Sequence, residues 1–179
     1  MNQSLLIADN LTGGYQTTSI IHQLNLHLDR GEWLSLLGGN GSGKSTLLKL
    51  LSRLLKPQHG LVWLDGKAIH TEPPNLVAQK MALLSTTDST QSLRYQLELL
   101  NLLKDLQQQQ WLTIITVLHE LNLAIRFSDR LAMLKNGSLV TVGTPSMVIT
   151  PEIVAEVFGV NMVTIDTPVG LQICPLSAR

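Results

Sequence analysis

Gly38-Gly39-Asn40-Gly41-Ser42-Gly43-Lys44-Ser45 is the stretch that decides the fold of this chain, because it matches G-x-x-x-x-G-K-[ST] at every fixed position. Glycines let backbone N–H groups converge on phosphate oxygens without side-chain clash, and a following helix points its positive end at them. Lys44 supplies a cation for the terminal phosphates, and the Ser45 hydroxyl can ligate magnesium. The candidate nucleotide-binding residues are Gly38, Gly39, Asn40, Gly41, Ser42, Gly43, Lys44, Ser45 and Thr46.

The alternative interpretation is a glycine-rich turn that matches this pattern by chance. The residues around the stretch argue against it, because they predict a strand before it and a helix after it. The predicted elements are a half-buried strand at 24–28, a turn at 29–32, a buried strand at 33–37, a helix from Ser45 that stops before Pro57, and a strand at 60–64 that ends at the Asp65-Gly66 turn.

The second half of the chain alternates predicted strands and helices. The predicted elements are a buried strand at 81–84, a patternless polar run at 85–92, a helix at 93–106, a buried strand at 111–118, a short helix at 120–127, and a hairpin of 131–134 with 139–142 around Asn136-Gly137. Thr144-Pro145 and Thr150-Pro151 predict two capped helices, Gly159 a left-handed cap, and 163–165 with 171–174 a final strand pair. This order predicts an α/β domain with a mainly parallel central sheet.

Composition favours a cytosolic protein with one domain. The 179 residues have a formal net charge of +0, which gives no long-range attraction to nucleic acid. The single cysteine, Cys174, cannot form an internal disulfide. No apolar run approaches the roughly 20 residues that span a bilayer, and Met1-Asn2-Gln3-Ser4 does not resemble the start of a signal peptide.

Tyr15 is a candidate for contact with a nucleobase. It follows Gly13-Gly14, where we expect a loop, and an aromatic ring at that place can stack on adenine. An aromatic residue that packs on a sheet edge is an equally good interpretation of the spacing.

Together these residues resemble the nucleotide-binding subunit of an ABC transporter. Tyr15 matches the adenine-stacking position of that family, and residues 36–48 match its Walker A block. Val117-Leu118-His119-Glu120-Leu121-Asn122 resembles the segment V-L-H-D-L-N that carries the switch histidine. The resemblance implies that His119 contacts the γ-phosphate and orients the attacking water, whereas a lone histidine at a strand end is more often structural. It also implies ATP and Mg²⁺ as cofactors.

Less general stretches are similar to ATP-binding subunits of ferric-siderophore importers, namely 94–100, 143–145, 157–160 and 165–175. Vitamin B12 and haem importers share parts of this pattern. The resemblance implies a P-loop NTPase (RecA-like) core with an antiparallel N-terminal β region. It implies a transmembrane permease as partner, a homodimer or a pair with a complete ATPase subunit, no nucleic acid, and a peripheral position on the cytoplasmic face of the inner membrane.

The middle of that family's domain is missing from the sequence. The Q-loop glutamine, the helical subdomain, the L-S-G-G-Q signature, the Walker B acids and the D-loop are absent, and no S-G-G triplet occurs anywhere. Residues 82–87 align either with the strand before the Q-loop or with the Walker B strand, where Ser85 and Thr86 would replace the acidic pair. Asp65 and Asp88 are better interpreted as solvated turn residues than as magnesium ligands.

We therefore predict a single truncated nucleotide-binding domain over 1–179. Residues 1–84 form the half with the phosphate loop, 85–92 the deletion junction, and 93–179 the half with His119. Such a domain is expected to bind nucleotide with impaired or absent hydrolysis and to be marginally stable and prone to aggregate. The alternatives are a non-catalytic remnant that binds nucleotide or a partner, an unrelated P-loop kinase, and a decayed gene product without activity.

Overall fold

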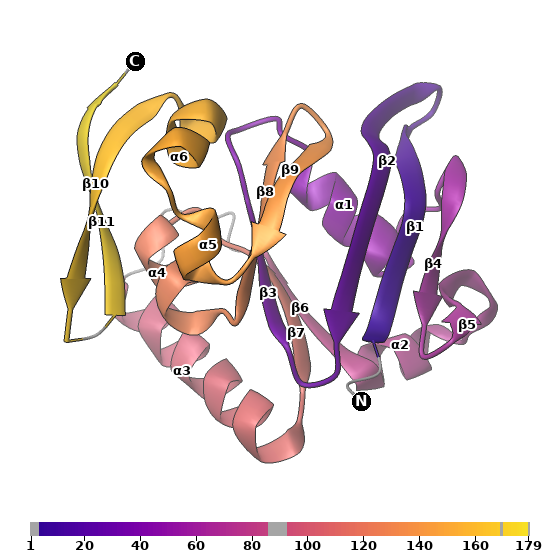
Figure 1. The fold of residues 1–179 in the computed structure, drawn as a ribbon. Helices are drawn as coiled ribbons and strands as arrows, with labels where there is room; N and C mark the ends of the chain where they lie inside the picture. The colour runs from indigo at the N-terminus through magenta and orange to yellow at the C-terminus, as the bar shows by residue number, and fades with distance from the viewer. Residues whose placement is uncertain (1–3, 86–92, 169, 179) are drawn as a thin grey trace.

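A computed structural model describes residues 4–85, 93–168 and 170–178 of the chain. Within these residues the strands form a five-stranded sheet, a four-stranded sheet and a two-stranded hairpin. The five-stranded sheet is central, with the four-stranded sheet on one side and the hairpin on the other (Figure 1). The chain is therefore an α/β protein, as predicted.

The central sheet is mainly parallel and has the strand order β6-β7-β3-β8-β9. Its strands are β3 (Trp33–Leu37), β6 (Met81–Ser85), β7 (Thr113–Val117), β8 (Arg130–Lys135) and β9 (Ser138–Gly143). β9 pairs antiparallel with β8, and the other three pairings are parallel. The predicted hairpin around Asn136-Gly137 joins β8 to β9.

Both faces of the central sheet are covered, so every residue of β3 and β7 is buried. Leu34 and Leu36 face one core, which contains residues of the four-stranded sheet and of α1 (Lys44–Leu51) and α2 (Pro74–Lys80). Trp33 and Leu37 face the second core. The helices of that second core are α3 (Leu93–Gln110), α4 (Leu121–Phe127), α5 (Pro145–Val148) and α6 (Pro151–Phe158).

The four-stranded sheet is antiparallel and confirms the expected N-terminal β region. It contains β1 (Ser4–Tyr15), β2 (Thr18–Asp29), β4 (His59–Leu64) and β5 (Lys67–Ala68), and a short 3₁₀ turn, η1 (Ile69–Thr71), follows β5. The sequence did not predict β1. Its pairing with β2 shifts register between Ala8 and Leu11, and Asn10 has a φ of 47°, so the alternation that identifies a strand is interrupted.

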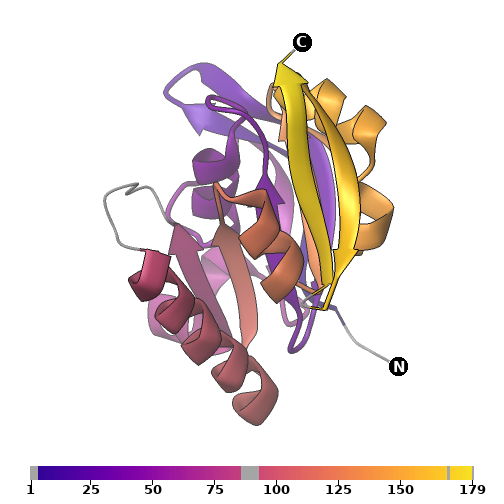
Figure 2. The same cartoon turned by 90° about the vertical axis from the view of Figure 1, so that its left-hand side faces the viewer.

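The C-terminal strand pair is an antiparallel hairpin of β10 (Val160–Thr167) and β11 (Gly170–Ala178). Figure 2 shows this hairpin lying beside α4. The side chain of Asn122 fixes it there, because its amide oxygen accepts from the N–H of Ile173 at 2.8 Å and its amide nitrogen donates to the Ile173 carbonyl at 3.3 Å.

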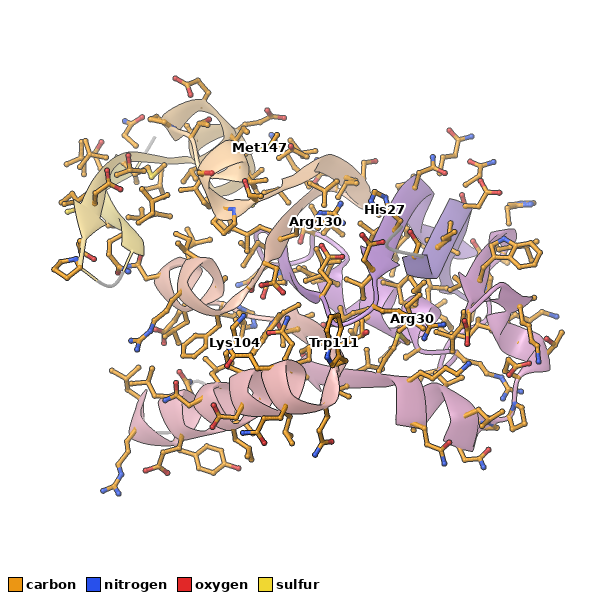
Figure 3. All side chains as sticks on the ribbon, turned by 60° about the horizontal axis from the view of Figure 1, so that its bottom comes forward. His27, Arg30, Lys104, Trp111, Arg130 and Met147 are labelled. Carbon is orange, nitrogen blue, oxygen red and sulfur yellow. The ribbon has the colours of Figure 1, made fainter. Side chains whose placement is uncertain are left out.

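Polar contacts fix α3 to the base of the central sheet. The buried side chain of Gln107 donates to the carbonyl oxygen of Gly31 at 2.7 Å and to the carboxylate of Asp129. Lys104 points from α3 toward the body of the protein and bonds Asp129 at 3.3 Å (Figure 3). The long helix predicted for this region is confirmed and extends to Gln110.

The helix after the phosphate loop is shorter than predicted, because α1 ends at Leu51 and not just before Pro57. Arg53 adopts a φ of 66°, which a continuing helix does not allow, and its guanidinium donates to the carbonyl of Glu72. The predicted helix therefore breaks at Arg53, which leaves Leu54 77% exposed, while Leu55 still packs against the core.

Smaller corrections concern the strand predicted at 111–118 and the cap at Thr144. Trp111 has a φ of 54° and is exposed, so the strand begins only at Thr113. The hydroxyl of Thr144 bonds Ser146 and not the backbone, whereas Thr150 accepts from the N–H of Ile153 as expected.

The region around the expected deletion junction is described in part. β6 is only half-buried, with Leu83 36% exposed, although the sequence predicted a buried strand. Apart from Ser85, the junction at 85–92 lies outside the described residues, as do Thr86 and Asp88.

Candidate functional site

The predicted phosphate loop connects the end of β3 to the start of α1, so strand, loop and helix follow in the expected order. Gly43 precedes the helix with a φ of 100°, and Gly38 has a φ of 151°. A Cβ atom on Gly38 would lie 2.3 Å from the carbonyl oxygen of Leu134. Glycine is therefore required at this position for steric as well as conformational reasons.

Lys44 lies inside the loop. Its side chain is 6% exposed, and its ammonium donates to the carbonyl oxygens of Gly38 at 2.8 Å and Gly39 at 2.9 Å. Burial holds the pKa of the Lys44 ammonium below its usual range. The residue therefore places a cation beside the loop backbone, where a bound phosphate would be.

The other candidate residues of the loop divide into an exposed rim and buried supports. Asn40, Gly41 and Ser45 are exposed, so their polar groups are open to a ligand. Ser42 and Thr46 are buried, at 5% and 6% exposure. Their burial indicates that they support the loop from beneath.

Tyr15 lies beside the first turns of α1. It is the last residue of β1, not part of a loop as predicted, and its ring is 43% exposed. The ammonium of Lys49 donates to its hydroxyl at 3.1 Å. This bond, together with one from Thr46, holds the pKa of the Tyr15 phenol below its usual range. The contact with Lys49 was not predicted from the sequence.

His119 comes to the same edge of the central sheet as the phosphate loop. β7 and β3 are adjacent and parallel, with Val117 opposite Leu36, and both candidate segments begin just after these paired residues. His119 is exposed. The carboxyl ends of parallel strands form one edge, so the topology brings His119 to the side of the sheet that carries the loop.

The structure provides no acidic pair at this edge among the described residues. β6 pairs with β7 so that Ser85 is opposite Val117, and no carboxylate follows within the described part of that strand. Groups of three or more His, Cys, Asp or Glu that could hold a metal ion are also absent there. Asp65 lies in the turn after β4, where Lys80 and Arg30 bind its carboxylate and hold its pKa below the usual range.

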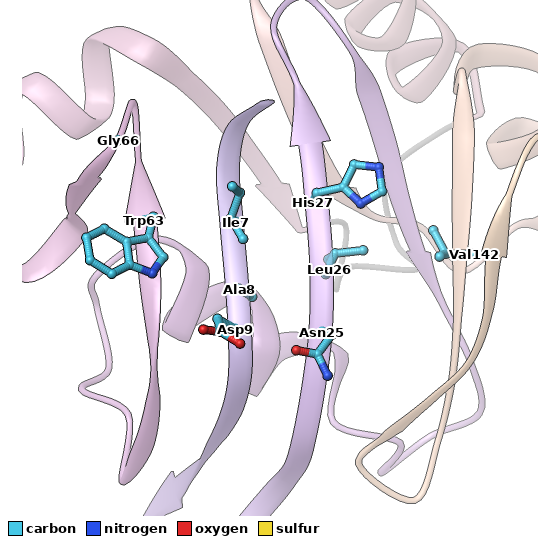
Figure 4. A pocket seen from close by; sticks show the side chains of 9 residues that line it. All are labelled: Ile7, Ala8, Asp9, Asn25, Leu26, His27, Trp63, Gly66 and Val142. Carbon is cyan, nitrogen blue, oxygen red and sulfur yellow. The ribbon is translucent and has the colours of Figure 1, made fainter. Parts of the chain in front are cut away.

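A separate pocket of about 470 Å³ lies on the four-stranded sheet (Figure 4). Ile7 of β1 is paired with Trp63 of β4 on one side and with His27 of β2 on the other, and Val142 of β9 also lines the pocket, so four strands contribute to it. None of the predicted site residues lines this pocket.

Comparison with known proteins identifies the family. The family model described as ABC transporter matches residues 21–141, which include the phosphate loop, β7 and His119. The chain belongs to the ABC transporter family.

Curated relatives of this ABC transporter chain include proteins of iron uptake. It is 25% identical to the ferric enterobactin transport ATP-binding protein FepC of Escherichia coli, over 92% of this chain and 90% of the relative. It is 27% identical to the iron(3+)-hydroxamate import ATP-binding protein FhuC of Bacillus subtilis, over 91% of each. The FepC alignment extends over 245 positions, more than the 179 residues of this chain, so the relative has residues that this chain lacks.

Solved structures confirm the fold of the ABC cassette. A protein described as a metal-chelate type ABC transporter, in an inward-facing conformation, superposes with a TM-score of 0.78 at 20% identity, over 98% of each chain. The cbiO1 protein of Clostridium perfringens, part of the complex cbiONQ, gives 0.71 at 18% identity, over 87% of this chain and 94% of the other. No helix among the described residues has the length and apolar character needed to cross a membrane.

Proposed function

We propose that this chain is the ATP-binding subunit of an ABC importer for ferric siderophores, and that it binds nucleotide with impaired or absent hydrolysis. The observation that carries the binding part is the buried ammonium of Lys44 within a loop of left-handed glycines at the start of α1. The importer class rests on the relatives, whose names specify ferric enterobactin transport and iron(3+)-hydroxamate import.

The proposed site has separate regions for the parts of ATP. Lys44 and the loop backbone bind the phosphates, and Tyr15 stacks on the adenine ring. Mg²⁺ fits in part, because the exposed Ser45 hydroxyl can be one ligand and phosphate oxygens and waters the others. The charge of the ion would offset that of the phosphates.

The hydrolytic machinery is incomplete in this proposal. His119 is the proposed switch histidine, but Ser85 ends β6 where a carboxylate would be needed to align water. Loss of a positioned general base costs about 10²–10⁴-fold in rate, or about 3–5 kcal/mol. Nucleotide binding depends on the loop and not on that carboxylate, so we expect binding to persist.

The proposed partners follow from the family. A transmembrane permease would hold the chain on the cytoplasmic face of the inner membrane, and a second ATPase subunit, identical or complete, would pair with it. The missing L-S-G-G-Q motif supports a second candidate function, a non-catalytic subunit that competes with an intact one for nucleotide or partner. Co-purification with a permease or an intact ATPase subunit tests that candidate.

Titration calorimetry with ATP tests the proposed binding. We expect saturable binding by the native chain and a loss of about tenfold or more in affinity for Lys44→Ala, because a charge-assisted contact to phosphate is removed. Lys56→Ala is the matched control, since Lys56 is an exposed lysine beyond the end of α1. Failure to detect saturable binding that depends on Lys44 would refute the proposal.

A further inference from the structure

Tyr15 is fixed by a bond that links the first strand to the helix of the phosphate loop. The Lys49 ammonium donates to the Tyr15 hydroxyl at 3.1 Å and lies 5.4 Å from the centre of its ring. Lys49 belongs to α1 and Tyr15 to β1, so the contact joins two elements far apart in the sequence. Such a bond restricts the rotation of an exposed ring.

Close packing between β1 and α1 makes this contact feasible. A Cβ atom on Gly13 would lie 2.7 Å from Cδ2 of Leu50, a side chain that is fully buried. Glycine at this position therefore lets the end of β1 approach α1 more closely than another residue would. Tyr15 follows two residues later and reaches Lys49, the neighbour of Leu50.

The turn that follows Tyr15 is held from a second direction. The amide nitrogen of Gln58 donates to the carbonyl of Gln16 at 3.1 Å, and its amide oxygen accepts from the Ser19 hydroxyl at 2.7 Å. Gln58 thus fixes the backbone of the β1–β2 turn, while Lys49 fixes the ring.

We propose that Lys49 is a positioning residue that raises the affinity of the site for the nucleobase by holding the Tyr15 ring, without binding phosphate itself. The inference rests on the proposed function. Lys49 is four residues beyond Ser45 on α1, which places it about 6 Å further along the axis from the phosphate end. It therefore acts on the base end of the nucleotide and leaves the loop contacts of Lys44 unchanged.

The main experiment compares ATP with inorganic tripolyphosphate in calorimetric titrations of Lys49→Met, Lys49→Arg and Lys56→Met. We expect Lys49→Met to weaken ATP binding by about three- to tenfold, because a mobile ring stacks less well on the base. Binding of tripolyphosphate should stay unchanged, and Lys49→Arg should retain ATP binding. Lys56→Met removes the same charge from an exposed site and should change neither affinity.

The other outcomes separate the two proposals. If the native chain binds neither ligand, the proposed function fails, and this inference with it. If the native chain binds ATP but Lys49→Met equals Lys56→Met, only the inference on Lys49 is overturned. A parallel loss of ATP and tripolyphosphate affinity in Lys49→Met would also overturn it, because Lys49 would then act on the phosphates or on the fold.

A spectroscopic measurement tests the contact between Lys49 and Tyr15. Tyr15 and Tyr95 are the two tyrosines of the chain, and tyrosinate has its own ultraviolet absorbance. Since Lys49 lowers the pKa of the Tyr15 phenol, Lys49→Met should move one of the two tyrosine titrations to higher pH. If both proteins fold equally well, identical titration curves for the native chain and Lys49→Met would contradict the bond.

Discussion

The backbone N–H of Gly137 donates a hydrogen bond to the carbonyl oxygen of Ser42 at 3.0 Å. This bond attaches the turn between β8 and β9 to the middle of the phosphate loop. The carbonyl oxygen of Gly137 in turn accepts from the N–H of His22 on β2 at 3.0 Å. The turn therefore connects the phosphate loop to the antiparallel sheet, and the shape of the loop depends on it.

Gly137→Ala is expected to destabilise the protein and the loop. Gly137 has a φ of 77°, and an added Cβ would lie 1.7 Å from the carbonyl oxygen of Ile20. The left-handed conformation alone costs about 1–2 kcal/mol, and the clash with backbone adds to it, so we expect about 3 kcal/mol or more. Chemical denaturation measures this change, and ATP titration should show weaker binding.

Gly66→Ala is the matched control for that substitution. Gly66 has a φ of 76°, but a Cβ atom added there would have no neighbouring atom within 4 Å. Its loss of stability should be limited to the conformational cost of about 1–2 kcal/mol. Equal losses of stability for the two variants would show that the clash of the added Cβ with the Ile20 carbonyl does not contribute to the loss.

The phosphate loop could be predicted from the sequence because its chemistry is local. The eight residues of the motif contain both the glycines that form the loop and the lysine that binds phosphate, so few other conformations or ligands are compatible with them. The contacts of Gly137 and Lys49 could not be predicted in this way. Asn136-Gly137 indicated a hairpin turn, as found. The contact of this turn with Ser42 depends on how distant elements pack, which the sequence does not indicate. β1 was missed for a local reason, since a register shift near Asn10 interrupts its alternation.

ATP affinity should fall as the pH rises through the alkaline range. Burial lowers the pKa of Lys44 in the free loop, and a bound polyphosphate raises it again, so binding takes up protons. Affinity is then fully present below the lowered pKa and decreases as the pH rises through it. Titrations from about pH 7 to about pH 10 should show this fall.

Lys44→Arg serves as the control for that pH dependence, because a guanidinium stays protonated throughout the range. The lowered pKa of Tyr15 adds a second titration, which a Tyr15→Phe background removes. If affinity falls equally with pH in Tyr15→Phe and in the double variant Tyr15→Phe/Lys44→Arg, the pH dependence belongs to another group.

The attachment of α3 to the central sheet should depend on Gln107. Gln107→Ala removes the donor to the carbonyl of Gly31 and leaves that group without its partner, so we expect a loss of about 1–3 kcal/mol in unfolding free energy. Gln109→Ala, on the exposed side of the same helix, should change stability by less than about 0.5 kcal/mol. Urea denaturation of both variants measures the difference, and similar values would refute the role of Gln107.

β6 is an uncharged edge strand of the central sheet and therefore a candidate for self-association. Within the described residues it pairs with β7 alone, and Met81–Ser85 carries no charged side chain. A charge on an edge strand opposes edge-to-edge pairing, so Leu83→Lys should reduce aggregation in light scattering at a given concentration. Leu102→Lys, a similar change on the exposed face of α3, should have a smaller effect. An equal reduction of aggregation in both variants would show that added surface charge, and not the position on the edge strand, is responsible.

The most direct measurement follows MgATP binding and phosphate release side by side, in the same preparations of the native chain and Lys44→Ala. We predict saturable binding by the native chain, a marked loss of binding by Lys44→Ala, and little or no phosphate release from either. Robust turnover by the native chain would contradict the proposal, because a carboxylate outside the predicted site would then have to align the attacking water.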